Sequence, residues 1–386
     1  MAFAYFFIRF TLFYTFRLYL SRKMCYTEKK GKEFLHSMLL PPLTAPLLSW
    51  YRTAGRALPW REARTPYHVW ISEIMLQQTR IEAVIPYYHR FLAAFPTVAS
   101  LAEADEERLL KLWEGLGYYS RARNLKRAAE AIVRDHGGEL PRDPEALRRL
   151  PGIGDYTAGA IASIAYGLPV PAVDGNVMRV VARVTADGRD VLSPAFRKEA
   201  TAALAALYPT APEAATAMTE ALMELGETVC IPNGAPHCDA CPLASLCRAR
   251  EEGKETELPY RAKRTARTVE KRTVLLLLTG GRVGIFRRPP EGLLAGLWEL
   301  PSADGALPES EVRELLAGWG LTPTAIRRGP EAKHIFTHRE WHMTSYLIDL
   351  AGEGGGLTFV NREELRTTFA IPTAFRTYLT LLDKEL

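Results

Sequence analysis

The segment from Leu150 to Val181 constrains the fold of this chain more than any other. It reads LPGIGDYTAGAIASIAYGLPVPAVDGNVMRVV and predicts a helix, a tight glycine turn and a second helix. Gly152 and Gly154 are expected to supply the backbone freedom that the turn requires. Successive backbone N–H groups in such a turn, backed by a helix N-terminus, form a cradle that fits a DNA phosphate. Asp174, eighteen residues after Tyr156, is predicted to open the next helix with its carboxylate near this cradle.

The composition is that of a chain with two or three domains. Of its 386 residues, 47% are apolar and 24% are charged. The formal net charge of +5 permits nucleic-acid binding but does not establish it. Cations gather in RARNLKR (residues 121–127) and RAKRTARTVEKR (residues 261–272), where they also fit a solvated helix face and a solvated linker.

The first 38 residues are treated apart from the fold. They are aromatic and basic, and Arg9 and Arg17 divide them into apolar runs shorter than the roughly 20 residues that span a bilayer. The segment also lacks the charged start and cleavage site of a secretory signal. We expect residues 1–38 to be a non-native or disordered extension, with Met38 as the working start. A mitochondrial transit peptide is the alternative.

Residues 39–250 are predicted to be helical, because apolar residues recur at spacings of three and four and Pro and Gly mark the turns. Within this region Ser72 is the expected N-cap of a helix, so that Glu73 falls in its first turn. By itself, an acid there is only a favourable partner of the helix dipole. LWEGLGYYSRARNLKRAA predicts a helix, a glycine turn and a helix, in which Tyr118 and Tyr119 would by themselves be half-buried aromatics.

Four cysteines follow within eighteen residues, with the spacing C-x7-C-x2-C-x5-C: Cys230, Cys238, Cys241 and Cys247. The only other cysteine is Cys25, so this grouping predicts a metal ion or a metal cluster. Disulfides are the alternative, but nothing marks the chain as secreted. Four thiolates suit zinc as well as an iron–sulfur cluster, so the residues alone leave both open.

The pattern changes near residue 273. TVLLLLTGGRVGIFRRP predicts a β-hairpin, HMTSYLIDL a further strand, and ESEVRELLAGWGL and TAFRTYLTLLDKEL two helices. Together they predict an α+β domain of about 110 residues. GLLAGLWELPS resembles the start of a Nudix box, yet no acidic helix that would bind Mg²⁺ follows it. This domain is therefore expected to bind its ligand without hydrolysing it. The missing acidic helix thus argues against the hypothesis that the chain is a nucleotide pyrophosphohydrolase.

LPGIGDYT and VDGNVMR, together with LPWR and SEIMLQQTR, closely resemble the adenine DNA glycosylases of the MutY type, within the helix-hairpin-helix, iron–sulfur DNA glycosylases. The resemblance covers residues 48 to about 386. It implies an all-α glycosylase domain with a [4Fe-4S] cluster loop, followed by an α+β Nudix-like domain. The expected boundaries are a six-helix barrel at about 60–167, a cluster domain from 39–59 and 168–250, a basic linker at 251–272 and a lesion-recognition domain at 273–386.

The resemblance also implies roles for single residues. Glu73 is the general acid, and Asp174 stays ionised and stabilises the cationic sugar. Asn176 orients Asp174, and Tyr156 reaches the same site. The implied substrate contacts are Arg56, Leu58 and Trp60 in the adenine pocket, Glu220 as a reader of the adenine, Gln78 and Tyr118 as wedges in the duplex, Gly152 and Gly154 in the hairpin, and Phe336, Thr337 and His338 in the lesion-reading loop.

Two departures from the family pattern are visible. The four cysteines are implied to bind a structural [4Fe-4S] cluster, but the first gap, usually six residues, has seven here (IPNGAPH). In HIFTHREWH, Thr337 stands where the family has serine between phenylalanine and histidine. Threonine keeps the hydroxyl and adds a methyl group, so recognition is expected to survive.

The expected function is hydrolytic excision of adenine opposite 8-oxoguanine or guanine in base excision repair. The expected partner is double-stranded DNA, and no association with a membrane is expected. The protein is expected to act as a monomer in the bacterial cytoplasm, at the nucleoid. The alternative is an endonuclease III-like glycosylase and lyase that acts on oxidised or mismatched pyrimidines. Those relatives carry a lysine at position 156, whereas the phenol of Tyr156 cannot form a Schiff base. A DNA-binding module without catalysis would have no need of both Glu73 and Asp174.

Overall fold

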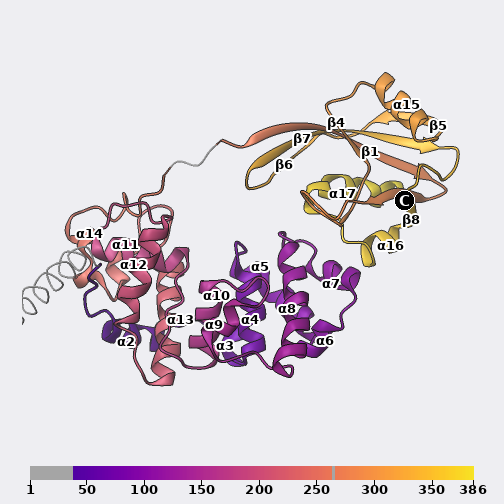
Figure 1. The fold of residues 1–386 in the computed structure, drawn as a ribbon. Helices are drawn as coiled ribbons and strands as arrows, with labels where there is room; N and C mark the ends of the chain where they lie inside the picture. The colour runs from indigo at the N-terminus through magenta and orange to yellow at the C-terminus, as the bar shows by residue number, and fades with distance from the viewer. Residues whose placement is uncertain (1–37, 263–265) are drawn as a thin grey trace, which may run out of the picture. The chain divides into compact units, whose positions relative to one another are not determined.

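The computed structural model describes residues 38–262 and 266–386, which form two compact units (Figure 1). The first unit consists of the described residues up to Ala57 and of Gly159–Ala262. The second consists of Leu58–Ala158 and of the described residues after the linker, up to Leu386. The predicted extension, apart from Met38, lies outside the described residues. In the described part of the chain, no helix has the length and apolar character needed to cross a membrane.

The first unit is helical, as predicted. Its helices are α2 (Thr44–Ala54), a π-helical turn (Ile161–Ala165), α11 (Gly175–Thr185), α12 (Pro194–Ala205), α13 (Pro212–Thr228), short 3-10 turns (Cys238–Ala240 and Ala244–Leu246) and α14 (Arg248–Glu251). Apolar faces of α2, α11, α12 and α13 pack into one core, in which Leu47, Val181 and Leu222 are fully buried. Burial of apolar side chains is the main stabilising term for such a unit.

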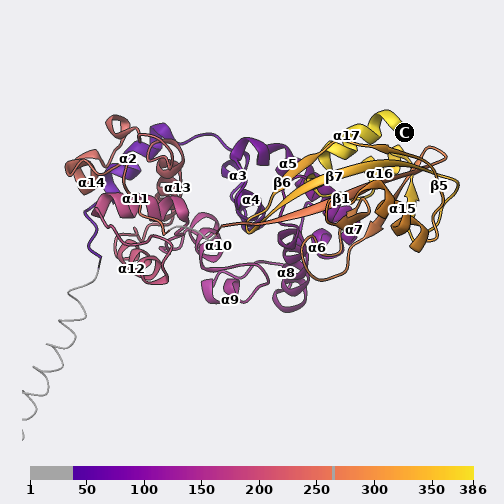
Figure 2. The same ribbon diagram turned by 90° about the horizontal axis from the view of Figure 1, so that it is seen from above.

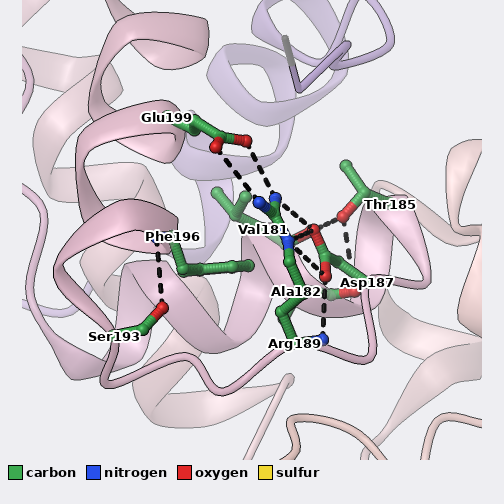
Figure 3. A network of polar contacts seen from close by, with 8 residues as sticks. All are labelled: Val181, Ala182, Thr185, Asp187, Arg189, Ser193, Phe196 and Glu199. Atoms are coloured by element: carbon green, nitrogen blue, oxygen red, sulfur yellow. Dashed lines mark hydrogen bonds and ion pairs between the residues drawn. The ribbon is translucent and has the colours of Figure 1, made fainter. Parts of the chain in front are cut away.

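An arginine joins the turn after α11 to α12 (Figure 3). Arg189 donates to both carboxylate oxygens of Asp187, at 2.7–3.1 Å, and to both oxygens of Glu199 on α12, at 2.9 and 3.1 Å. Ser193, the N-cap of α12, accepts from the N–H of Phe196 at 3.2 Å. Exposed ion pairs add little stability, but this bidentate geometry fixes the direction in which α12 leaves the turn.

The helical part of the second unit also follows the prediction. It contains α3 (Pro59–Glu62), α4 (Pro66–Leu76), α5 (Ile81–Ala94), α6 (Val98–Ala102), α7 (Glu106–Trp113), α8 (Ser120–His136) and α9 (Pro144–Arg148). Helix α10 (Asp155–Ala160) crosses from this unit into the first. The predicted helix, glycine turn and helix are therefore α9, residues 149–154 and α10.

Of the two hairpin glycines, only Gly152 lies at a position that requires glycine. Gly152 has a φ of +77°, and a Cβ atom there would lie 2.6 Å from Cβ of Asn124. Any side chain at this position would therefore clash and be strained. Gly154 does not lie in the left-handed region, and nothing lies within 4 Å of the Cβ that it lacks. The expectation that Gly154 supplies backbone freedom is wrong.

The predicted start of the helix that carries Glu73 is also wrong. Helix α4 begins at Pro66, after Thr65, whose side chain accepts from the N–H of His68 at 3.2 Å. The Thr-Pro pair supplies both an N-cap and a first-turn proline, which is a stronger start signal than a single serine. Ser72 lies inside the helix, buried, and donates to the carbonyl of Val69 at 2.9 Å. Glu73 therefore lies near the C-terminal end of α4.

The C-terminal part of the second unit is an α+β domain with an eight-stranded sheet. Its strands are β1 (Thr268–Thr279), β2 (Arg282–Arg287), β3 (Trp298–Glu299), β4 (Ser302–Asp304), β5 (Pro323–Arg328), β6 (Ala332–Ile335), β7 (Arg339–Leu350) and β8 (Thr358–Val360). The main strand order is β3-β2-β1-β7-β5, and β1 and β7 run parallel. The predicted hairpin is β1 and β2. The last five residues of the predicted linker, 268–272, belong to β1.

Helices cover both faces of this sheet (Figures 1 and 2). They are α15 (Glu309–Gly318) on one face, and α16 (Arg362–Thr367) and α17 (Arg376–Glu385), preceded by a 3-10 turn (Thr373–Phe375), on the other. The run Val274–Leu277 of β1 is fully buried, with alternate side chains in the two cores. A strand covered on both faces reads as a continuous apolar run, which explains the sequence VLLLL.

Removal of the cap of α4 should destabilise the second unit. We expect Thr65→Ala to lower the free energy of unfolding by about 1 kcal/mol, because the N–H of His68 loses its acceptor. The measurement is urea unfolding followed by tryptophan fluorescence. Thr380→Ala, in an exposed helix interior of α17, is the control and should leave the transition within a few tenths of a kcal/mol of the wild type. An equal loss in both variants would contradict the assigned cap.

Candidate active site

The first part of the candidate site is a carboxyl group paired with a phenol in the second unit. Glu73 is 5% exposed on a helix whose neighbouring side chains, from Val69 to Met75, are buried. The hydroxyl of Tyr156, in the first turn of α10, donates to Oε2 of Glu73 at 2.5 Å. Since Tyr156 comes two residues after the hairpin, the fold of the hairpin sets the position of the phenol. This hydrogen bond orients one carboxylate oxygen and occupies one of its lone pairs.

The second part is Asp174, the N-cap of α11 in the first unit. Its Oδ1 accepts from the N–H of Val177 at 2.7 Å. Burial of the carboxyl group raises the pKa of Asp174, while the N–H of Val177, the charge of Arg179 and the hydrogen bonds of Asn176 lower it. The net shift is upward, so the ionised form expected for Asp174 depends on these donors.

Arg179 connects the start of α11 to the first cysteine. It is 2% exposed and donates to Oδ1 of Asn176 at 2.8 Å, to the carbonyl of Gly226 at 2.6 Å and to the carbonyl of Cys230 at 2.7 Å. Burial lowers the pKa of Arg179, and the nearby Cys230 raises it. Arg179 therefore contacts both Asn176, which is predicted to orient Asp174, and Cys230, the first residue of the cysteine segment.

Two buried carboxylates of α13 face α2 and the residues after it. The hydroxyl of Tyr51 donates to Oε2 of Glu220 at 3.0 Å, and Nε of Arg56 donates to Oε1 of Glu224 at 2.5 Å. Glu220 and Glu224 are only 3% and 1% exposed. The sequence identified Arg56 and Glu220 but missed Tyr51 and Glu224. Two acids four residues apart in the apolar stretch TEALMELGETV are a signal that could have found Glu224.

Leu58 and Trp60, the other predicted pocket residues, belong to the second unit. They are 5% and 7% exposed, at the N-cap and in the first turn of α3. The indole of Trp60 contacts the ring of Tyr88 edge to face, with the ring centroids 5.6 Å apart. The packing of this part of the second unit thus fixes both side chains.

The predicted wedge residues lie together. Tyr118 is 47% exposed, and its hydroxyl donates to Oε1 of Gln78 at 2.6 Å and forms a hydrogen bond of 2.7 Å with Oγ1 of Thr337. Both Gln78 and Tyr118 have left-handed backbones, with φ values of 60° and 48°. Tyr119, in contrast, is buried, and burial raises its pKa. Of the two tyrosines in GLGYY, only Tyr118 is presented to solvent.

The predicted lesion-reading loop connects β6 to β7. Phe336 turns inward and contacts His334 and Trp341 edge to face, at centroid distances of 4.6 and 4.8 Å. Thr337 and His338 are exposed at the tip. The loop therefore uses Phe336 for packing and presents a hydroxyl group and an imidazole outward.

The Nudix-like domain contains a buried carboxylate that is paired with an arginine. Glu299 on β3 is fully buried, and both of its oxygens lie 2.7 Å from Nη1 of Arg288. Burial raises the pKa of Glu299, and Arg288 opposes that shift. Across the described residues, no group of three or more acidic, histidine or cysteine side chains is placed to bind a metal ion.

The four cysteines line one cavity of about 30 Å³ in the first unit. Its other walls include Val180, Leu225 and Glu255. Arg183 donates to Sγ of Cys230 at 3.3 Å and to the carbonyl of Ile231 at 3.0 Å. Burial raises the pKa of the Cys241 thiol to about 11. The thiols surround a shared space, but they are not placed around one metal ion.

Comparison with known proteins gives matches to both parts of the chain. Residues 71–209 match the family model of the HhH-GPD superfamily base excision DNA repair protein, and residues 273–381 match the NUDIX domain model. An adenine DNA glycosylase of Homo sapiens is 36% identical over 396 residues, which covers 86% of this chain and 72% of that protein. An adenine DNA glycosylase of Rattus norvegicus is 35% identical over 394 residues, which covers 86% of this chain and 76% of that protein.

A solved structure of a thermostable thymine-DNA glycosylase is 28% identical, with a TM-score of 0.48, and covers 58% of this chain and 99% of that chain.

The hairpin, the helical fold around it and the HhH-GPD match define a DNA glycosylase of base excision repair. The Nudix-like domain that follows restricts this class to the DNA glycosylases that also carry such a domain. The chain belongs to the adenine DNA glycosylase family. The resemblance of LPGIGDYT, VDGNVMR and SEIMLQQTR to that family, and the predicted fold class, are confirmed. The roles of the single site residues stay predictions.

The raised pKa of Asp174 predicts how its neutral isostere changes stability with pH. Because the pKa is raised in the folded state, the carboxyl group begins to destabilise the fold above the unfolded-state pKa of about 4, and the effect is complete above the folded-state pKa. We expect Asp174→Asn to be more stable than the wild type near pH 7, because asparagine keeps the cap without the buried charge. The gain should shrink as the pH falls through the raised pKa and vanish well below the unfolded-state pKa of about 4, where the wild-type carboxyl group is protonated in both states.

Urea unfolding at a series of pH values measures this difference. Asp304→Asn, whose side chain is 95% exposed, is the control and should show a small difference that does not follow this trend. A wild type that is more stable than Asp174→Asn at neutral pH would contradict the upward shift.

Proposed function

We propose that this protein excises adenine opposite 8-oxoguanine or guanine from double-stranded DNA by hydrolysis, without cleaving the strand. The observation that carries the proposal is the hydrogen bond of 2.5 Å between the hydroxyl of Tyr156 and Glu73. A phenol stands where lyases of this superfamily carry an amine nucleophile, and it orients the predicted general acid. The exposed hydroxyl groups of Tyr118 and Thr337 support recognition of a modified base opposite adenine.

Each carboxyl group has a part in the proposed reaction. The sugar becomes cationic as the bond from its anomeric carbon to adenine breaks. Glu73 gives its proton to a ring nitrogen of adenine, so that the base leaves neutral. Water then adds to the anomeric carbon, and its proton passes to Glu73. Asp174, ionised with the help of Val177 and Asn176, stabilises the positive sugar in between. The products are free adenine and an abasic site.

Tyr156 also argues against the endonuclease III-like alternative. A lyase step needs an amine that condenses with the opened sugar and loses water. A phenol has no nitrogen for this bond. We therefore expect the abasic product to remain unbroken until alkali is added.

A single-turnover assay tests this function. The substrates are duplexes with adenine opposite 8-oxoguanine, guanine or thymine, analysed with and without alkali, and with borohydride as a trap for an imine. We expect breaks only after alkali and in the order 8-oxoguanine, guanine, thymine. Glu73→Gln should slow the reaction by at least about a hundredfold, in the range typical of general acid catalysis.

Glu82→Gln, an exposed first-turn residue of α5, is the matched control and should excise at the wild-type rate. Breaks without alkali, together with a borohydride adduct, would overturn the monofunctional mechanism. Equal rates opposite 8-oxoguanine and thymine would overturn the proposed specificity.

We propose that Cys230, Cys238, Cys241 and Cys247 bind a [4Fe-4S] cluster. In such a cluster each thiolate binds its own iron, so the sulfurs surround a volume and do not converge on one ion. All four cysteines line one cavity without converging on a single metal-binding point among the described residues, which supports this reading over zinc. The cluster would crosslink the segment between α13 and α14, which has little regular structure.

Metal analysis separates the two possibilities. Protein purified without oxygen should contain iron and acid-labile sulfide in equal amounts and absorb visible light. Cys238→Ser should lose both, whereas Cys25→Ser should keep them. Removal of the iron by a chelator should increase amide exchange in residues 229–262, because binding energy becomes folding energy in such sites. Stoichiometric zinc without sulfide would contradict the cluster.

We further propose that the protein acts as a monomer in the bacterial cytoplasm at the nucleoid, without a membrane. Import into mitochondria is the alternative if residues 1–38 are a transit peptide. Sedimentation of the protein with and without a duplex, and microscopy of the tagged full-length chain, test these two statements.

A further inference from the structure

Arg121 is a buried arginine whose hydrogen bonds all go to the backbone. It lies in the first turn of α8 and is 8% exposed. One terminal nitrogen, Nη1, donates to the carbonyls of Ile74, Met75 and Gln77 at 2.6, 3.1 and 2.8 Å. The other, Nη2, donates to the carbonyls of Leu116 and Gly117 at 2.9 and 3.2 Å. One guanidinium group thus joins two chain segments about forty residues apart.

The carbonyls that Arg121 binds directly precede the two predicted wedge residues. Those of Ile74, Met75 and Gln77 lie at the C-terminal end of α4 and lead into Gln78. Those of Leu116 and Gly117 lead into Tyr118. The last carbonyls of a helix have no partner within the helix, and a cation at that end is favourable.

The two wedge residues need such support. Gln78 and Tyr118 have φ values of 60° and 48°, in the left-handed region that residues with a Cβ atom rarely adopt. A strained conformation of this kind persists only where its surroundings fix it. With both residues fixed in this way, the hydroxyl of Tyr118 lies 2.6 Å from Oε1 of Gln78.

The charge of Arg121 has no counter-ion among the described residues. The guanidinium lies 5.3 Å from the ring centroid of Trp113 and 5.7 Å from that of Tyr118. Burial lowers its pKa to about 10, so it remains charged at neutral pH. An apolar side chain of similar size would fill the same space without the free-energy cost of burying a charge. Packing alone therefore does not explain an arginine at this position. Only a planar fork of donors serves two segments at once, which a lysine ammonium cannot do.

We propose that Arg121 is the positioning residue that couples the two DNA-reading turns, so that Gln78 and Tyr118 enter the duplex as one preformed unit. It contacts no substrate. This inference rests on the proposed function for its effect on excision, but the coupling itself is a property of the free protein.

The test compares Arg121→Met, Arg121→Lys and the control Arg134→Met in the full chain. Arg134 is on the same helix, is exposed and pairs with the adjacent Asp135, so the control removes the same charge. The first measurement is amide hydrogen exchange of the free protein. We expect faster exchange in Arg121→Met only at residues 76–79 and 115–119, with α5 and β1 unchanged.

The second measurement uses DNA. With 2-aminopurine in place of the target adenine, extrusion of the base is read as a rise in fluorescence. We expect extrusion and single-turnover excision to slow between about tenfold and a hundredfold in Arg121→Met, since hydrogen bonds to a charged group are lost. The Kd for an undamaged duplex should change less than about threefold, because the guanidinium is buried and its hydrogen bonds all go to the backbone.

Arg121→Lys keeps the charge and should slow excision nearly as much as Arg121→Met, because it cannot serve both segments. It also keeps the test decisive if Arg121→Met fails to fold. Unchanged exchange in both segments, or a wild-type rate of extrusion in Arg121→Lys, would overturn the inference. A wild type that excises no adenine, with exchange altered as expected, would overturn the proposed function and leave the coupling in place.

Discussion

Two buried guanidinium groups on α11 fix the arrangement of the unit that carries Asp174 and the cysteines. Arg179 and Arg183 are 2% and 3% exposed and donate mainly to backbone carbonyls. Their acceptors belong to Gly226, Cys230, Ile231 and Leu258. In the described residues between α13 and β1 there are only short helical turns, so most carbonyls there need partners from elsewhere. Arg179 also donates to Asn176, the residue predicted to orient Asp174. Loss of order in the cysteine segment would therefore change the position of Asp174.

Features set by local chemistry could be predicted from the sequence. The cap at Asp174 follows from VDGN ahead of an apolar periodic run, and Asp174 does cap α11. The hairpin of β1 and β2 follows from two glycines between apolar runs, and both Gly280 and Gly281 have positive φ values. The helical region and the α+β domain follow from the two periodicities in the same way.

What could not be predicted depends on distant partners or on short elements. Tyr51 and Glu220 are 169 residues apart, and nothing near either residue specifies the other. Arg121 looked like one cation of a basic run, because its five carbonyl acceptors carry no sequence signal. Strands such as β3, with two residues, are too short to show a period. Ser72 failed as a cap because Thr65 and Pro66 begin the helix earlier.

The parallel pairing of β1 with β7 has a consequence for synthesis of the chain. Thr268 pairs with Arg339 and Leu278 with Asp349, so each partner leaves the ribosome 71 residues after the other. Until β7 is made, the apolar run of β1 has one side of its backbone unpaired, and such a run readily joins the same run of another chain. Pairing at this separation is also slow. Nascent chains of this glycosylase therefore pass through a window of self-association. We expect a message that ends before β7 to yield a chain that aggregates and that also lacks the loop that presents Thr337.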